Sequence, residues 1–208
     1  HDALPIFLGT WFHEMGHGLA ALILGGDFHK ITMHEYGGAA SLSTSSDWLP
    51  SRIYWPLVAA AGPMGPPVVG SIFILMSRTV RGAQIALYIL VTCLAVSLLV
   101  WMRGMWGIVA VALLTAAIGA AVYYLKPEQR QFFAKFIGVQ AALATFLNWR
   151  YLFTYSTGDF HVNGMAVGLS DTGYIQQALW LPYWFWGALI AVFAAWLVVA
   201  SLQRAYKQ

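Results

Sequence analysis

Three residues of one apolar segment have the types and the spacing for metal-assisted hydrolysis. His13, Glu14 and His17 lie within the stretch GTWFHEMGHGLAAL, which begins at Gly9. Residues four apart on a helix lie about 40° apart around the axis and about 6 Å apart along it, so both imidazoles can face one metal ion. Zinc suits such a site because imidazole is one of its preferred ligands. The pattern HExxH therefore predicts that His13 and His17 bind zinc and that Glu14 is the general base that takes a proton from the attacking water.

The alternative interpretation of these residues is structural, because a histidine within a helix is more often packed and hydrogen-bonded than bound to a metal. Two features favour the metal site. HExxH rarely arises by chance in a chain that contains only six histidines. A carboxylate at bilayer depth costs a few kcal/mol, and such residues usually face a cavity and mark a functional site.

The composition indicates that a lipid bilayer surrounds these residues. The chain is 60% hydrophobic and only 9% charged, whereas about 25% of the residues in a soluble domain are charged. The net charge of +3 comes from scattered residues rather than from a patch, so nucleic acid is not expected as a partner. The single cysteine, Cys93, excludes a disulfide within the chain.

Six segments are long and apolar enough to be transmembrane helices, which need about 20 residues each. They are 3–24, 53–76, 85–102, 105–125, 132–153 and 183–202. We expect a single domain over residues 1–208: an all-α integral membrane protein with about six transmembrane helices and a short membrane-associated β-hairpin after the first.

The basic residues are unevenly divided between the two sides that these six segments define. The side on which the first segment begins collects more of them, and the positive-inside rule predicts that this side is cytoplasmic. Its basic residues are Arg78, Arg81, Lys126, Arg130, Lys135, Arg204 and Lys207.

Two connections are too long to be simple turns, and long loops in compact domains are often functional. The first connection, 26–50, has an alternating residue pattern and β-branched residues around Tyr36-Gly37-Gly38. This pattern predicts the hairpin. We predict that Gly37 and Gly38 contribute an exposed edge to which an unwound substrate adds as a strand. The alternative is an interfacial loop without this role. The second connection, 154–182, contains several polar residues.

Glycine and proline cluster inside the second apolar segment, as Gly62-Pro63 and Gly65-Pro66-Pro67. Proline removes helical hydrogen bonds and kinks or interrupts a helix, and broken helices at membrane depth are tolerated where they line a cavity. We therefore predict a water-filled groove beside the zinc, with Gly62 and Pro63 as substrate-binding residues. The alternative is a structural kink that allows tight helix packing.

These motifs together resemble the site-2 protease family of intramembrane zinc metalloproteases, in particular its compact bacterial protease-B-like branch. The similarity lies in HEMGHGLAALILGG, in the segment 26–45 at the place of the family's hairpin, and in AAGPMGPP at 60–67. The resemblance implies zinc as cofactor, cleavage of a membrane protein or peptide within or near the bilayer, and a location in the bacterial cell (inner) membrane.

Two positions differ from the usual pattern of that family. Pro66 stands where many members have an asparagine that is implicated in holding substrate. The usual Leu-Asp-Gly motif of the third ligand is absent, and its nearest equivalent is LSDTG at 169–173.

Two histidines leave zinc under-coordinated, and we predict that Asp171 supplies the third ligand. The helix-like segment that follows it can carry a carboxylate down to the metal, and its place before the last apolar segment resembles the family's compact branch. Asp159 and His161 are the alternative protein ligands, and water or another group is the remaining alternative. Ser170 or Asp171 as the N-cap of a helix is the alternative role for this segment, and it needs no metal.

Two other functions are compatible with these residues. A haem-binding or metal-binding membrane subunit would explain a buried histidine, but it gives no role to Glu14, and histidines one turn apart cannot bind opposite faces of a haem. A protease-like scaffold that has lost turnover would explain Pro66 and the unusual third motif.

Overall fold

The described part of the chain is mainly helical. The computed structural model describes residues 3–34, 37–42, 46–156, 161–162, 165–166 and 168–207. The helices are α1 (Ala3–Ile23), α2 (Ser51–Met76), α3 (Val80–Val100), α4 (Met105–Tyr124), α5 (Pro127–Leu147), α6 (Trp149–Leu152), α7 (Asp171–Leu179) and α8 (Tyr183–Tyr206). The strands are β1 (Phe28–His34), β2 (Gly37–Leu42), β3 (Met102–Arg103), β4 (His161–Val162) and β5 (Met165–Ala166).

Long helices form at all six predicted segments, but not all of them qualify as membrane spans. Within the described residues, α2, α3, α4 and α8 are long and apolar enough to cross a membrane. The polar HEMGH sequence lowers the hydropathy of α1, and three charged side chains lower that of α5. The protein is thus a multi-pass membrane protein, and the predicted count of six spans is not confirmed.

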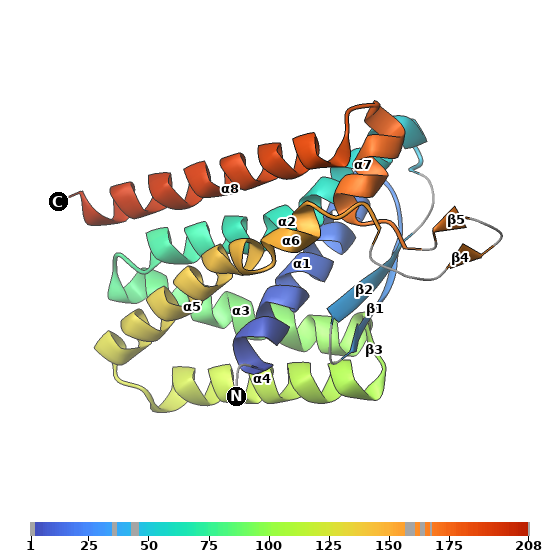
Figure 1. The fold of residues 1–208 in the computed structure, drawn as a ribbon. Helices are drawn as coiled ribbons and strands as arrows, with labels where there is room; N and C mark the ends of the chain where they lie inside the picture. The colour runs from blue at the N-terminus through green and yellow to red at the C-terminus, as the bar shows by residue number, and fades with distance from the viewer. Residues whose placement is uncertain are drawn as a thin grey trace.

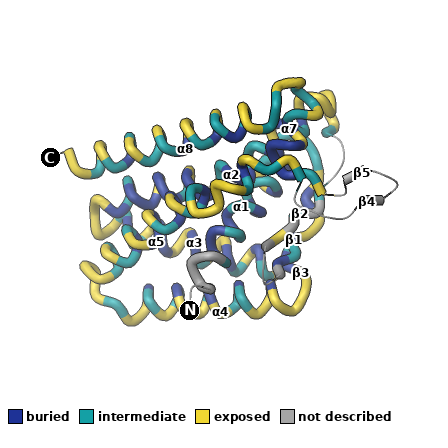
Figure 2. Tube along the Cα trace, in the orientation of Figure 1, coloured by how far each residue is buried: buried dark blue, intermediate teal, exposed yellow. Residues whose placement is uncertain are grey.

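Helices α1 and α2 lie in the interior of the bundle and position the other elements (Figure 1). Helix α2 packs against α1, α5, α7 and α8, while α3 packs against α4 and α5. Buried residues gather on the inner faces of these helices, and their outer faces are exposed and largely apolar (Figure 2). Such an outer surface suits lipid rather than water.

Glycines bring α1 and α2 into backbone contact beside the HExxH motif. A Cβ atom at Gly16 would collide with the carbonyl of Ala61, and one at Gly65 would collide with the carbonyl of Phe12. A Cβ atom at Gly62 would collide with the imidazole ring of His17. The small residues therefore let the motif lie directly against α2.

Helix α2 runs without interruption through its prolines, contrary to the predicted break. Pro67 has no N–H to donate to the carbonyl of Pro63, four residues earlier. The hydroxyl of Thr145 on α5 donates to that carbonyl instead, at 2.8 Å. Both residues are buried, so a side chain from a neighbouring helix replaces the missing backbone bond. The arrangement favours the alternative of tight helix packing.

A three-stranded sheet in the order β2-β1-β3 lies at one end of the bundle. Strands β1 and β2 pair antiparallel, from Phe28 opposite Leu42 to His34 opposite Gly37. Their connection, 35–36, lies outside the described residues, and the predicted association of this hairpin with the membrane surface stays a prediction. Strand β2 forms one edge of the sheet, so only one of its sides is paired within it.

The substitution Thr145→Val tests the bond between the helices. It preserves shape but leaves the buried carbonyl of Pro63 without a donor, so we expect a loss of about 1–3 kcal/mol in the free energy of unfolding. Thermal or denaturant unfolding in detergent measures it. Thr115→Val is the matched control, because the Thr115 hydroxyl bonds to Val111 on its own helix, α4. Equal unfolding curves for Thr145→Val and wild type would contradict the assignment.

Candidate metal centre

The two histidines of the HExxH motif converge as the helical spacing predicts. Their Nε2 atoms lie 3.2 Å apart. The Nδ1 atom of His17 lies 2.8 Å from the carbonyl oxygen of Val58 on α2. A carbonyl can only accept, so Nδ1 carries the proton, and in the neutral ring Nε2 keeps a free lone pair that faces His13. Helix α2 thereby selects the tautomer that a metal ion requires.

Asp171 brings a carboxylate to the same point from the other end of the sequence. Its Oδ2 lies 3.1 Å from Nε2 of His13, and its Oδ1 lies 3.3 Å from Nε2 of His17. Asp171 is the first residue of α7, and Ser170 is the N-cap, whose hydroxyl accepts from the N–H of Gly173 at 3.1 Å. The capping role thus belongs to Ser170, and the carboxylate of Asp171 is left to face the histidines.

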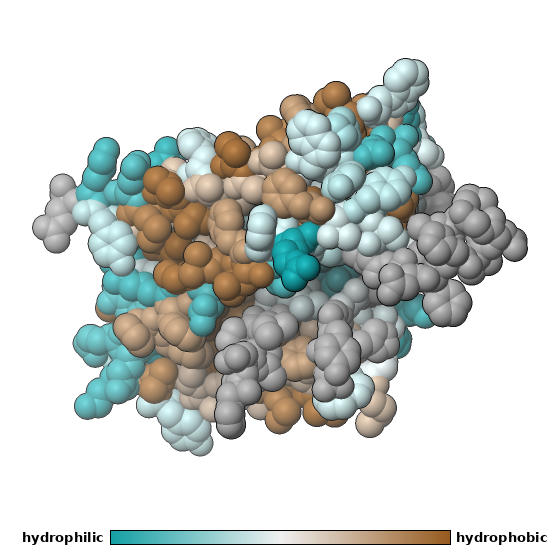
Figure 3. Space-filling model, viewed as in Figure 1, coloured by the Kyte–Doolittle hydropathy of each residue, from teal (hydrophilic) through white to brown (hydrophobic). Residues whose placement is uncertain are grey.

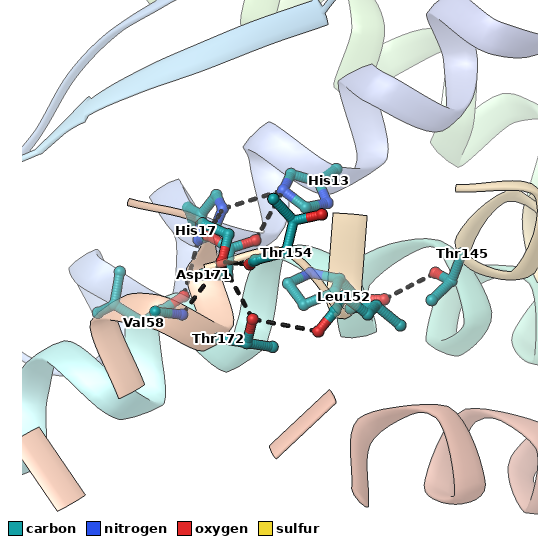
Figure 4. A network of polar contacts seen from close by, with 11 residues as sticks. His13, His17, Val58, Thr145, Leu152, Thr154, Asp171 and Thr172 are labelled. Atoms are coloured by element: carbon teal, nitrogen blue, oxygen red, sulfur yellow. Dashed lines mark hydrogen bonds and ion pairs between the residues drawn. The ribbon is translucent and has the colours of Figure 1, made fainter. Parts of the chain in front are cut away.

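Side chains at the start of α7 fix it to the segment that contains α6 (Figure 4). The hydroxyl of Thr172 donates to the carbonyl of Leu152 at 3.2 Å, and the hydroxyl of Ser170 donates to the carbonyl of Thr154. Ser170 and Thr172 are both buried. These bonds hold the Asp171 backbone in place, so the carboxylate is positioned from outside the histidine helix.

The three groups fit a zinc ion. Ligand atoms at 2.0–2.1 Å from a tetrahedral zinc lie about 3.3 Å from one another. The two Nε2 atoms lie 3.2 Å apart, and each faces a different oxygen of the Asp171 carboxylate at 3.1 or 3.3 Å. The Oδ2 atom of Asp171 is buried without a hydrogen bond, although it lies close to His13. Among the described residues, His13, His17 and Asp171 form the group that can hold a metal ion.

Electrostatics keep Asp171 in the form that binds a cation. Burial alone would raise the pKa of its carboxyl, but the attraction of His17 and His13 lowers that pKa well below its usual value. The carboxylate is therefore ionised. Protonated imidazole rings supply this attraction, and a metal ion would take the place of their Nε2 protons.

Glu14 lies between the histidines and the edge of the sheet. It is 6% exposed, and the backbone N–H of Ala40 on β2 donates to its carboxylate. A Cβ atom at Gly38 would lie 2.9 Å from Cγ of Glu14 and 3.0 Å from its Oε1. Ala40 pairs with Ile31 of β1. Because the N–H of Ala40 bonds to Glu14 rather than to β1, this N–H points away from the partner strand. The free edge of β2 therefore faces the Glu14 carboxylate.

The cluster is enclosed but not sealed. The side chains of His17 and Asp171 are 12% and 8% exposed, whereas that of His13 is 21% exposed. The site therefore opens on the side of His13.

Tyr151 on α6 is a further neighbour of the cluster that sequence reasoning missed. Its ring contacts that of His13 edge-on, with centroids 5.8 Å apart, and it hydrogen-bonds to Asp171. Its place at the end of an apolar segment gives no local signal of this role, since tyrosines are common at membrane interfaces.

The other predicted site residues lie in different settings. Gly62 is buried against the ring of His17, and Pro63 is buried against Thr145, so both have packing roles, and substrate binding by them stays a prediction. Gly37 begins β2. Of the alternative third ligands, Asp159 lies outside the described residues and His161 begins β4.

One comparison with known proteins identifies the family of the chain. A family model described as Peptidase M50B-like matches residues 5–201, which is nearly the whole chain. Comparison with curated proteins and with solved structures finds no match. The match confirms the resemblance inferred from the sequence motifs, and the chain therefore belongs to the Peptidase M50B-like family, within the site-2 protease family of intramembrane metalloproteases.

Proposed function

We propose that the protein is a zinc endopeptidase that hydrolyses a peptide bond of a membrane protein or peptide within or near the bilayer of a bacterial cell membrane. One observation carries the proposal: two imidazoles and a carboxylate converge at zinc-ligand spacing beside the buried Glu14. His13, His17 and Asp171 would hold the ion. When bound there, zinc lowers the pKa of a water molecule towards 7 and polarises a carbonyl group.

The residues of the chain supply the proton transfers. The Glu14 carboxylate accepts a proton from the attacking water and passes it to the amine that leaves. The bond from Ala40 orients this carboxylate, and Gly38 leaves room for it. The Nδ1 bond to Val58 fixes the orientation of the His17 ring and places the proton of the neutral tautomer on Nδ1, so that Nε2 is the nitrogen that would bind the ion.

The edge of β2 gives the substrate a place to bind in extended form. A helical peptide hides its amides in its own hydrogen bonds, whereas a segment added to a sheet edge is unwound. Because the free edge of β2 faces Glu14 at Ala40, a strand added there lies beside the base. Gly37 and Gly38 belong to this edge and carry no side chain that would obstruct it.

The geometry argues against the haem alternative. The two imidazole nitrogens are on one helix and lie 3.2 Å apart, so they cannot approach opposite faces of a porphyrin. The short distances to Asp171 also leave no room for a macrocycle between the three groups.

Metal analysis of the purified protein tests the ligand set. We expect about one zinc per chain, which is lost in His17→Ala and Asp171→Ala because a three-ligand site fails without one of them. His29→Ala, on the exposed face of β1, is the matched control and should keep its zinc. Stoichiometric zinc in the double variant His13→Ala, His17→Ala would refute the ligand assignment.

The substitution Glu14→Gln separates chemistry from metal binding. Glutamine keeps the shape but cannot take a proton, so we expect at least a 10²–10⁴-fold loss of proteolytic rate with the zinc retained. Glu128→Gln, at the exposed start of α5, is the control and should leave the rate unchanged. Wild-type turnover by Glu14→Gln would remove Glu14 from the mechanism, and a wild-type protein that holds zinc but cleaves no substrate would support an inactive scaffold.

Gly38→Ala tests whether β2 sets the position of the base. The added methyl group presses on Cγ and Oε1 of Glu14, and displacement of a catalytic group by a fraction of an ångström costs on the order of tenfold or more in rate. We expect kcat to fall while zinc content stays constant. Gly119→Ala on α4, where an added Cβ meets open space, is the control. An unchanged kcat for Gly38→Ala would show that the strand does not constrain Glu14.

A further inference from the structure

One end of the helix bundle carries an excess of positive charge that the proposed proteolysis does not use. It is formed by the turn between α2 and α3, the turn between α4 and α5, and the end of α8 (Figure 1). Its basic residues are Arg78, Arg81, Lys126, Arg130, Lys135, Arg204 and Lys207, and Glu128 is the acidic side chain described there. Hydrophilic residues gather at this end, next to an apolar surface over the middle of the bundle (Figure 3).

A cavity of about 260 Å³ opens at this end between α2, α5 and α8. Two of the cations, Arg78 and Lys135, line it, and the rest of its wall is mostly apolar. The other lining residues are Ile74, Val139, Leu202, Ala205 and Tyr206. The cavity thus joins positive charge to an apolar wall, which is the chemistry of an anionic amphiphile.

The two cations have no carboxylate partner in the part of the chain that is described, where the ion pairs join Asp171 to the histidines. Lys135 lies eight residues after Pro127, the first residue of α5, which is about 12 Å along the helix. A lysine at that depth in an apolar bundle needs an anion or a route to the interface. The cavity beside it supplies the space for that anion.

Fixed contacts between α2 and α5 shape the cavity. Gly70 and Gly138 bring the two backbones into contact, with no space for a Cβ atom at either position. Beyond this point, the amide of Gln131 donates to the carbonyls of Ser77 and Arg78, at 2.9 and 3.1 Å. The helices are therefore held together on both sides of the cavity, so its walls are built in rather than formed by loose side chains.

We propose that this cavity is a binding site for an anionic phospholipid. The phosphate lies against Arg78 and Lys135, and an acyl chain follows the apolar wall formed by Val139 and Leu202. Basic pockets between membrane helices on the cytoplasmic side bind anionic head groups in this way. The site lies at the end that the positive-inside rule makes cytoplasmic, whereas the metal centre lies near the sheet at the other end (Figure 1).

Lipid retention by the full-length protein in detergent tests the proposal. The protein is titrated with phosphatidylglycerol, and bound lipid is counted by native mass spectrometry. We expect one tightly held molecule per chain, and about 10- to 30-fold weaker binding for the double variant Arg78→Gln, Lys135→Gln. The double variant Arg81→Gln, Arg204→Gln removes the same charge from the same end but does not line the cavity, so it should bind as wild type does.

Two further arms separate a built site from general attraction. Ala205→Trp fills the cavity and keeps every charge, so we expect this variant to lose the lipid. Thermal unfolding shows whether Arg78→Gln, Lys135→Gln folds. If that variant does not fold, Ala205→Trp alone tests whether the lipid binds in the cavity. Glycerol phosphate in excess should not displace the lipid, and phosphatidylcholine should not replace it. Equal losses in the two double variants, full binding by Ala205→Trp, displacement by glycerol phosphate or equal binding of phosphatidylcholine would each overturn the proposal.

Discussion

The convergence of two imidazole lone pairs and one carboxylate in the interior of an apolar bundle is the constraint on which the site depends. Nε2 of His13, Nε2 of His17 and the carboxylate of Asp171 lie 3.1–3.3 Å apart. A carboxylate buried beside two imidazoles needs positive charge close to it, which protons on the rings or a metal ion can supply. The fold therefore has to hold three polar side chains together inside an apolar bundle, and much of the structure around them serves this purpose.

His17, Asp171 and Glu14 are each held by a different element. Helix α2 fixes His17 through the carbonyl of Val58 and through the space that Gly62 leaves for the ring. Ser170 caps α7, and the bonds of this turn to the α6 segment hold Asp171 from outside. The edge of β2 holds Glu14 through Ala40. His13, His17, Asp171 and Glu14 thus come to one point because the helices and the sheet that support them are packed together.

The sequence predicts the parts of this site that local patterns encode. The spacing of HExxH gives His13 and His17, and the helix-like segment after Asp171, together with the family resemblance of its place before the last apolar segment, points to Asp171. The supporting groups escape prediction because the carbonyl of Val58 and the N–H of Ala40 belong to backbones that any sequence provides. The break expected in α2 was wrong for a related reason: Thr145, on another helix, supplies the hydrogen bond that Pro67 cannot make. The number of membrane spans does not follow from the positions of the helices, because His13, Glu14 and His17 make α1 polar.

X-ray absorption at the zinc edge tests the central claim most directly, because it reports which atoms surround the ion. The protein is purified with one equivalent of zinc and compared with His13→Ala. We expect nitrogen and oxygen neighbours at about 2.0–2.1 Å with the outer-shell scattering of two imidazoles, and of one imidazole in any zinc that His13→Ala retains. Sulfur neighbours, a shell without imidazole scattering, or an identical spectrum from His13→Ala would contradict the account.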